Sequence, residues 1–130
     1  MSDRPTPTRP VGPYTPAIRV GDWLVCSGQV PLRDGELVSD PIEAATRQCV
    51  SNIAALLDQH GARLDQVAKT TVFMTDMADY PAMNEAYMEA FGAHRPARSA
   101  VAVAALPLGA RIEIEAWAYL GREVPAGAEH

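Results

Sequence analysis

The stretch that decides the fold runs from Pro96-Ala97-Arg98-Ser99 to Arg111-Ile112-Glu113-Ile114-Glu115-Ala116. On both sides of Leu106-Pro107-Leu108-Gly109, the side chains alternate in character with a period of two. That period is typical of β-strands, whose successive side chains point to opposite faces. We therefore predict two successive strands, joined by a turn at residues 106–109 and adjacent to each other in one sheet.

The second of these strands has two different faces. One face is apolar from Ile112 to Leu120, whereas the other carries charged and aromatic side chains: Arg111, Glu113, Glu115, Trp117 and Tyr119. A sheet face that combines two large rings with three charges is poorly suited to bulk water. We therefore expect another subunit to cover this face, with its charged side chains in or beside a cleft.

Length and composition indicate an ordinary globular protein. A chain of 130 residues suits one domain, and 48% hydrophobic with 21% charged residues is not the composition of a disordered chain. We place the domain at residues 11–121, between a mobile arm over residues 1–10 and a frayed tail over residues 122–130. Lys and Arg number 11 against 16 Asp and Glu, and the resulting net charge of −5 argues against a nucleic-acid partner.

Cysteine usage and hydropathy predict a cytoplasmic protein. Cys26 and Cys49 do not have the spacing of a metal site, so we expect buried, reduced thiols. The sequence contains no apolar run of membrane-spanning length and no hydrophobic segment of a signal peptide near Met1. We therefore expect no membrane partner.

The first part of the chain predicts a hairpin with an interruption. Residues 17–20 and 23–30 flank the turn Gly21-Asp22, and a short strand follows at residues 36–38. The apolar run of the second arm is broken at Ser27-Gly28-Gln29. A glycine inside a strand marks either an edge bulge or the close approach of a ligand or another backbone, and both interpretations stay open here.

Two amphipathic helices and one more strand complete the predicted fold. The helices begin after Asp40 and Asp79 as N-caps, and Asn52 is expected on the outer side of the first. Residues 67–74 form a strand rich in β-branched side chains. The core stripe of the second helix is Tyr80, Met83, Tyr87 and Phe91. This order predicts an α+β fold with both helices on one face of a mixed sheet.

Few residues offer chemistry. The three histidines are scattered: His60, His94 and His130. They lack acidic or thiol neighbours at ligand spacing, so we expect no metal, and no cofactor motif is present. Arg98 is suited to a bidentate grip on a carboxylate, and Glu113 or Glu115 to activating a water molecule. The alternative is a salt bridge across adjacent strands, which the pattern alone favours.

Several segments of the chain resemble the RidA/YjgF family, and most closely its archetypal RidA branch. They are Gly12-Pro13-Tyr14, Ser27-Gly28-Gln29, Thr46-Arg47-Gln48, residues 69–76, residues 83–87, Pro96-Ala97-Arg98-Ser99 and residues 112–116. Their order and spacing cover nearly the whole chain apart from both tails.

The resemblance implies a chorismate-mutase-like α+β fold assembled as a homotrimer, with clefts between subunits. It also implies cofactor-free hydrolysis of small 2-imino or 2-enamino acids, such as 2-iminopropanoate and 2-iminobutanoate, to 2-oxo acids and ammonia. By the family motifs, Arg98 holds the substrate carboxylate and Glu113 positions and activates water. The other cleft-lining positions are Tyr14, Ser27, Gly28, Asn84, Ala100 and Pro107.

One position departs from the family pattern. The family often has a cysteine where this chain has Ala100. The backbone N–H of that position can still meet a carboxylate, so the departure removes only roles that need the thiol, such as redox-triggered chaperone behaviour.

Two other functions stay open. One is a deaminase for a specialised pathway enamine of the aminomuconate or aminoacrylate type, for which Arg98 and Glu113 serve equally well. The other is a trimeric small-molecule-binding or regulatory protein that uses the same cleft without turnover. A ribonuclease or translation-inhibitor role, attributed to relatives, is the weakest choice because the chain is acidic and lacks a basic stripe.

Overall fold

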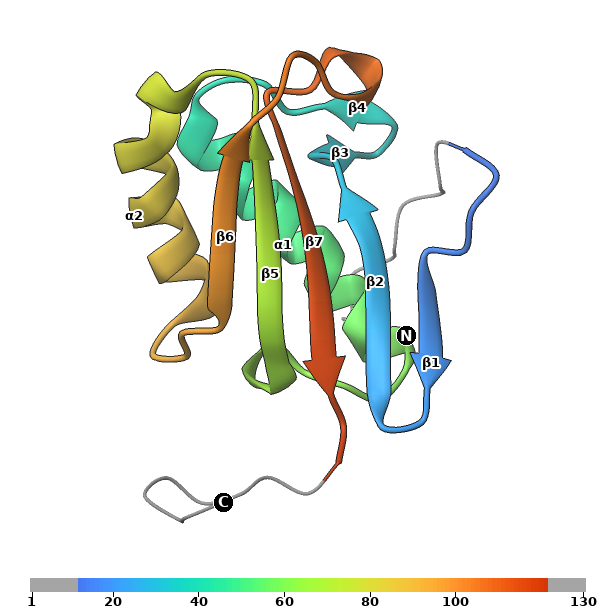
Figure 1. Ribbon diagram of the computed structural model, residues 1–130. Helices are drawn as coiled ribbons and strands as arrows, with labels where there is room; N and C mark the ends of the chain where they lie inside the picture. Colours follow the sequence, from blue (N-terminus) through green and yellow to red (C-terminus); the bar gives the residue numbers. More distant parts are fainter. Residues whose placement is uncertain (1–11, 122–130) are drawn as a thin grey trace.

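The structure of the protein is a computed structural model that describes residues 12–121 (Figure 1). Its main sheet has the strand order β1-β2-β7-β5-β6. The strands are β1 (Ala17–Val20), β2 (Trp23–Gln29), β5 (Val67–Met74), β6 (Ala97–Ala102) and β7 (Ile112–Tyr119). Because β5 and β6 are parallel while the other pairs are antiparallel, the sheet is mixed, as predicted. The predicted arm at residues 1–10 and tail at residues 122–130 lie outside the described residues.

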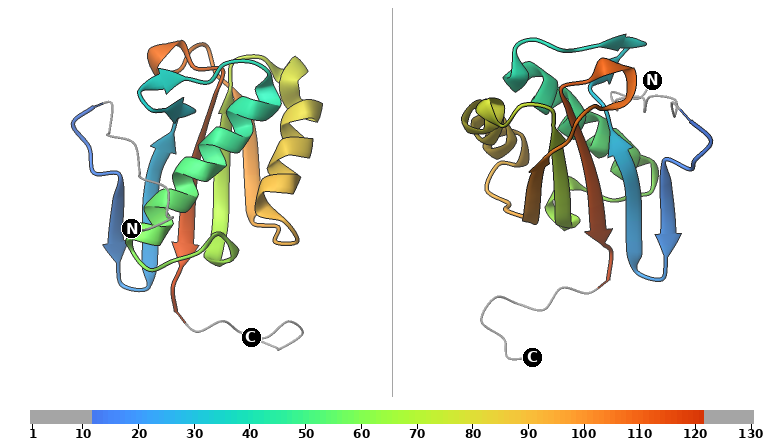
Figure 2. Two further views of the ribbon diagram at one scale, coloured as in Figure 1. Left: turned by 180° about the vertical axis from the view of Figure 1, so that it is seen from behind. Right: turned by 45° about the horizontal axis from the view of Figure 1, so that its top comes forward.

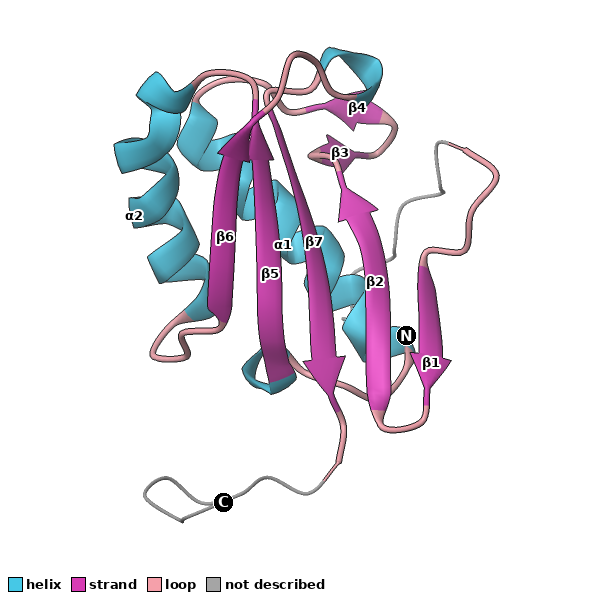
Figure 3. Ribbon diagram, viewed as in Figure 1, coloured by secondary structure: helices cyan, strands magenta, loops and turns pink. Residues whose placement is uncertain are grey.

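Two helices, α1 (Ile42–Gln59) and α2 (Tyr80–Phe91), cover one face of this sheet, as the view from behind shows (Figure 2). The smaller elements are β3 (Leu32–Arg33), β4 (Glu36–Leu37) and the 3₁₀ turns η1 (Leu64–Gln66), η2 (Met77–Asp79) and η3 (Pro107–Gly109). Strands β3 and β4 form a separate two-stranded sheet (Figure 3). The predicted α+β class, with both helices on one face, is confirmed.

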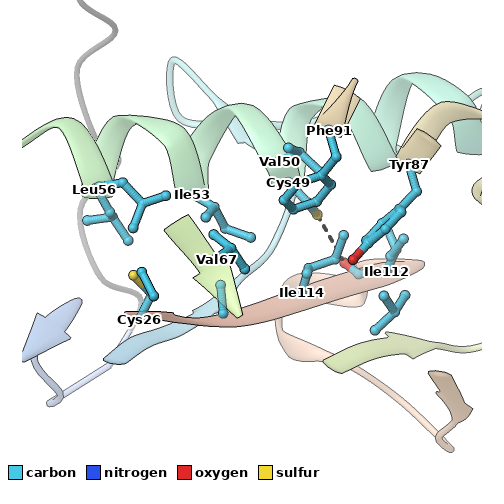
Figure 4. Close-up of a cluster of buried hydrophobic side chains, with 14 of the residues drawn as sticks. Cys26, Cys49, Val50, Ile53, Leu56, Val67, Tyr87, Phe91, Ile112 and Ile114 are labelled. Carbon is cyan, nitrogen blue, oxygen red and sulfur yellow. Dashed lines mark hydrogen bonds between the residues drawn. The ribbon is translucent and has the colours of Figure 1, made fainter. Parts of the chain in front are cut away.

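The core lies between the sheet and the helices (Figure 4). Ile112 and Ile114 of β7 are completely buried, and they belong to one cluster with Ile53 and Leu56 of α1. Burial of such an aliphatic side chain contributes about 1.5–3 kcal/mol, so the apolar face of β7 fixes the strand against α1. Because side chains alternate along a strand, the side chains of the opposite face of β7 point away from the helices.

Both cysteines lie in this core. Cys26 of β2 and Cys49 of α1 are buried and free, as the sequence predicted. Burial raises the pKa of Cys26 to about 11 and that of Cys49 well above its ordinary value. A thiol in such surroundings stays protonated at neutral pH, so neither cysteine is suited to act as a nucleophile.

The predicted adjacency of the last two strands is wrong. Strand β5 lies between β6 and β7, and the connection from Val103 to Arg111 passes the end of β5 to reach β7 (Figure 1). The reason is the crossover through α2, which returns the chain to the starting end of β5 and makes β6 its parallel neighbour. A salt bridge between directly adjacent strands is therefore not available to Arg98 and Glu113.

Asp79 occupies the N-cap position of α2 as predicted, whereas the N-cap of α1 is Pro41 rather than Asp40. Neither Asp40 nor Asp79 makes a side-chain cap bond to the helix that follows it. Instead Arg111 binds both carboxylates: Nη1 contacts Asp40, and Nη2 lies 2.8 Å from Oδ2 of Asp79. Nη1 also donates to the carbonyl of Ser39 at 3.0 Å. Arg111 thus ties the starts of both helices to the start of β7.

Asn52 of α1 is buried rather than on the outer side of the helix. Its amide donates to the carbonyls of Val30 and Leu32 at 3.1 and 3.0 Å. Leu32 begins β3 and Val30 lies two residues before it, so these bonds fasten the start of β3 to α1.

The second face of the sheet points toward the viewer in Figure 1, and no helix covers it among the described residues. Trp23 packs edge-on against Trp117 and Tyr119 there, with ring centroids 6.1 and 5.0 Å apart. Trp23 and Trp117 are 37% and 43% exposed, and Ile18 and Val20 of β1 are more exposed still. Such a patch is typical of an interface. Its coverage by another subunit stays a prediction.

Candidate functional site

Arg98 lies on β6 and extends its side chain toward α2. Its Nη2 donates to the Tyr80 hydroxyl at 3.0 Å, and Nη1 lies 3.9 Å from the sulfur of Met83. The guanidinium carbon is 5.5 Å from the centre of the Tyr80 ring and 4.9 Å from that of Tyr87. Aromatic faces attract a cation without neutralising it. The guanidinium is therefore positioned by α2 and keeps its full charge.

The contacts of Arg98 leave room for an anion. Within residues 12–121, no carboxylate lies at ion-pair distance from its guanidinium. A guanidinium carries five N–H donors in a planar fork, and such a fork matches a carboxylate. On the same helix, Oδ1 of Asn84 is buried and finds no hydrogen-bond donor in the described part of the chain. A half-buried cation and an unsatisfied acceptor thus occur on neighbouring elements.

Glu113 lies on the uncovered face of the sheet, opposite to Ile112 and Ile114. Its carboxyl group occupies the space above Gly28: a Cβ atom added there would lie 2.8 Å from Cδ and 2.9 Å from Oε2 of Glu113. The register of β2 and β7 shifts between Cys26 and Gln29, which confirms the predicted bulge. The glycine is therefore both a bulge residue and the site of a close approach, here by a side chain of the same chain.

The surroundings of Glu113 make it a stronger base. Burial, and then the negative charge of Glu115, raise the pKa of the Glu113 carboxyl above its ordinary value. Each cause disfavours the ionised form. A carboxylate with a raised pKa accepts a proton from water more readily than an ordinary one, provided that it is ionised at the working pH.

Ser27 lies near the end of β2, beside the segment that precedes β1 and carries Tyr14. The Ser27 hydroxyl donates to the carbonyl of Thr15 at 2.7 Å, and its backbone N–H donates to the carbonyl of Pro16 at 2.8 Å. These bonds fasten the segment that carries Tyr14, whose side chain is 41% exposed. Ser27 therefore supports the position of Tyr14 in the isolated chain.

The remaining predicted residues, Ala100 and Pro107, lie on β6 and in η3. The methyl group of Ala100 packs against the main core, which places it on the same side of β6 as Arg98. Pro107 is exposed in the connection between β6 and β7.

A single chain separates the predicted site residues into two groups. Arg98 is aligned with Thr70 of β5, which in turn is aligned with Ala116 of β7, and both of these are completely buried under the helices. Glu113 is aligned with Phe73 of β5 on the other face. The Arg98 group, with Asn84 and Ala100, therefore lies on the helix side, and Glu113 with Gly28 lies on the uncovered side.

The sequence prediction missed the contacts that hold Arg98. Tyr80 was assigned to the core stripe of α2, yet its side chain is 37% exposed and binds the guanidinium. Met83, Tyr87 and Phe91 are buried as predicted. The available signal was position: Tyr80 is the first residue of α2, and the buried residues of this helix begin one turn later at Met83.

The described residues offer neither a metal site nor a cavity at the predicted site. Within residues 12–121, no group of three or more His, Cys, Asp and Glu side chains is arranged to hold a metal ion. A polar cavity of about 540 Å³ is present at the end of the sheet, but it contains none of the predicted site residues. Its lining is Arg63, Asp65, Gln66, His94 and Gly121.

Comparison with known proteins identifies the family. The family model described as Endoribonuclease L-PSP matches residues 3–120. The chain belongs to this family, which is also called RidA/YjgF. A RutC family protein of Pyrococcus horikoshii is 47% identical over 113 residues, covering 85% of this chain and 90% of that protein. The mouse 2-iminobutanoate/2-iminopropanoate deaminase is 40% identical over 118 residues, covering 89% of this chain and 87% of that protein.

The solved structures of RidA/YjgF proteins share the fold. The crystal structure of E. coli TdcF with bound serine superposes with a TM-score of 0.80 at 32% identity, covering 92% of this chain and 95% of that one. In the part of the chain that the structure describes, no helix combines the length and the apolar character needed to cross a membrane.

Proposed function

We propose that this protein hydrolyses reactive 2-imino and 2-enamino acids to 2-oxo acids and ammonia. The observation that supports this most is the guanidinium of Arg98, which is held by aromatic rings and has no carboxylate partner within residues 12–121. Relatives such as the mouse protein are named 2-iminobutanoate/2-iminopropanoate deaminase, and TdcF was crystallised with serine, a small molecule that carries a carboxylate.

The site that this function needs is built from two copies of the chain. Arg98 and Glu113 lie on opposite faces of one sheet, so a bound acid reaches both only across a subunit boundary. The exposed rings of Trp23 and Trp117 give the uncovered face the apolar character of an interface. We assign the assembly to a homotrimer in which Glu113 of one subunit faces Arg98 of its neighbour.

The reaction requires positioning more than activation. Arg98, with the backbone N–H of Ala100, binds the carboxylate of R–C(=NH)–COO⁻ and fixes C2 of the imine. Water adds to C2 while Glu113 accepts one of its protons and returns it to the nitrogen, which gives the carbinolamine R–C(OH)(NH₂)–COO⁻. Glu113 then accepts the hydroxyl proton and passes it to the nitrogen as the C–N bond breaks, so that R–CO–COO⁻ and NH₃ leave. Holding water and imine together contributes up to about 7 kcal/mol in favourable cases.

The other predicted residues shape the cleft. The unpartnered Oδ1 of Asn84 is suited to accept the N–H of the imine. Gly28 leaves room for the Glu113 carboxyl, and Ser27 fastens the segment of Tyr14. Pro107 closes the end of the cleft.

The test is a competition assay. An amino-acid oxidase generates imines from several amino acids, semicarbazide traps them, and the protein is added. We expect wild-type protein to suppress semicarbazone formation and release ammonia. Arg98→Ala should abolish this activity, and Glu113→Gln should lower kcat by more than it weakens binding. Near-normal turnover by Arg98→Ala would disprove the assigned role of Arg98.

The same assay separates the two alternatives. A preference for enamines of aminomuconate or aminoacrylate type over simple imines would favour the specialised deaminase. Ligand-induced thermal stabilisation without ammonia release would favour a binding protein.

A further inference from the structure

Two tyrosines of α2 contact Arg98, but their hydroxyl groups are used differently. The Tyr87 hydroxyl is buried and hydrogen-bonded to Oγ1 of Thr70 at 2.6 Å. The Tyr80 hydroxyl lies 3.0 Å from Nη2 of Arg98, on a side chain that is 37% exposed. Both rings stack near the guanidinium, so the hydroxyl contact is what distinguishes Tyr80 from Tyr87.

The direction of the Tyr80–Arg98 bond follows from the chemistry of the two groups. A guanidinium only donates, so the Tyr80 oxygen must be the acceptor. The hydroxyl proton then points away from Arg98, and the described residues 12–121 provide no hydrogen-bond acceptor for it. The Tyr80 O–H is therefore an additional hydrogen-bond donor beside the N–H groups of the Arg98 guanidinium.

The backbone holds Tyr80 firmly in this position. Asp79, which precedes it, pairs with Nη2 of Arg111 at 2.8 Å, and the Asp79 side chain is only 18% exposed. Arg111 directly precedes β7, the strand that carries Glu113. The start of α2 is thus tied to β7, and this partly buried ion pair restrains the backbone that carries Tyr80 beside Arg98.

We propose that Tyr80 is a second carboxylate-binding residue of the site. Its oxygen orients Nη2 of Arg98, and its proton is donated to the same carboxylate that the guanidinium binds. The proposal rests on the proposed function for the identity of the ligand, a 2-imino acid or its 2-oxo acid product. The groups assigned to the ligand carboxylate, the guanidinium, the Ala100 N–H and the Tyr80 O–H, all donate, so they accept a carboxylate and reject a carboxamide, whose NH₂ group would meet donors only.

The experiment measures binding directly. 2-Oxobutanoate and its amide are titrated calorimetrically into wild-type protein, Tyr80→Phe and Tyr87→Phe, with melting temperatures recorded for each. Tyr80→Phe keeps the ring over Arg98 and removes one charge-assisted hydrogen bond, so we expect about tenfold weaker binding of the acid and a smaller preference for acid over amide.

Tyr87→Phe is the matched variant, because it removes a hydroxyl that faces Thr70 instead of the ligand. We expect it to lower the melting temperature more than Tyr80→Phe does and to weaken binding less. In turnover, Tyr80→Phe should raise KM by about tenfold and leave kcat within about twofold, which a merely structural role would not produce.

The outcomes separate this proposal from the proposed function. Equal binding of the acid by wild-type protein and Tyr80→Phe would overturn the role of Tyr80, whatever the turnover. Tyr80-dependent binding without any ammonia release would support the role and remove the deaminase function. No detectable binding of the acid by wild-type protein would overturn the role as well.

Discussion

Arg98 and Arg111 are the same side chain in two opposite settings. Arg111 binds two carboxylates and a carbonyl, and its charge is paired in contacts that join the starts of α1 and α2 to the start of β7. Arg98 contacts two rings, a hydroxyl and a sulfur, all of them neutral. Paired charges stabilise a fold, whereas a positioned and unpaired cation is available to a ligand. We therefore propose a structural role for Arg111 and a ligand-binding role for Arg98.

The largest expected effect separates the two arginines by stability. Arg111→Ala leaves Asp79 half-buried without a partner and frees the starts of both helices. We expect a loss of about 2 kcal/mol in the free energy of unfolding, less than for a fully buried pair. Arg98→Ala should cost less than about 1 kcal/mol, because it removes only partly exposed cation–π contacts.

Urea unfolding followed by circular dichroism measures both values. Arg63→Ala is the control, since Arg63 pairs with Asp65 on the surface and both side chains are more than half exposed. If Arg98→Ala were as destabilising as Arg111→Ala, the division of roles between the two arginines would be lost.

A smaller effect is expected at Gly28, on the Glu113 side of the site. The Cβ of Gly28→Ala would overlap the carboxyl group of Glu113. Because this carboxyl group is the flexible end of a side chain, we expect it to move out of its position. We expect kcat to fall by about tenfold, with little change in melting temperature. The variant should have no further effect in a Glu113→Gln background, and an additive loss would show that Gly28 acts elsewhere.

The smallest expected effect concerns pH. The folded-state pKa of Glu113 is raised by burial and by Glu115, so the protonated form is favoured by folding. Its contribution to stability is therefore present below the unfolded-state pKa and lost as pH rises through the folded-state pKa. Glu115→Gln removes one of the two causes and should lower the pKa of Glu113 part of the way.

The acid limb of the pH–rate profile measures this change. We expect Glu115→Gln to shift that limb to lower pH, because the lower pKa lets Glu113 become ionised at a lower pH. Glu36→Gln is the control, since Glu36 lies on β4 in the separate two-stranded sheet. An unchanged limb in Glu115→Gln would mean that a group other than Glu113 limits the rate.

Local patterns in the sequence were sufficient for most of the fold, and tertiary contacts explain the failures. The alternation of β7 and the interruption at Gly28 were readable because they depend on neighbouring residues. Asp40 and Asp79 have the residue type of helix caps, but a distant arginine competes for them, and no local pattern reveals that competitor. The adjacency of β6 and β7 failed because pairing depends on the α2 crossover.

The candidate site was predictable by residue type but not by arrangement. Arg98 and Glu113 were identified through their motifs, yet their separation onto two sheet faces needed the strand order. Tyr80 was misassigned because the helical period gives the side of a helix on which a residue lies but not how deeply its side chain is buried. Glu113 and Gly28 contact each other across a bulge, which a sequence marks without showing what fills the space.

The central claim is that Arg98 and Glu113 act together from different subunits. Arg98→Ala chains, which we expect to be inactive, and Glu113→Gln chains, which we expect to have a strongly lowered kcat, are unfolded together, refolded as a 1:1 mixture and assayed for imine hydrolysis. If neighbouring subunits of a trimer share each site, about one quarter of the sites in a random mixture are intact, so we predict recovery of about one quarter of wild-type activity. Activity no higher than that of the separate variants would contradict the account.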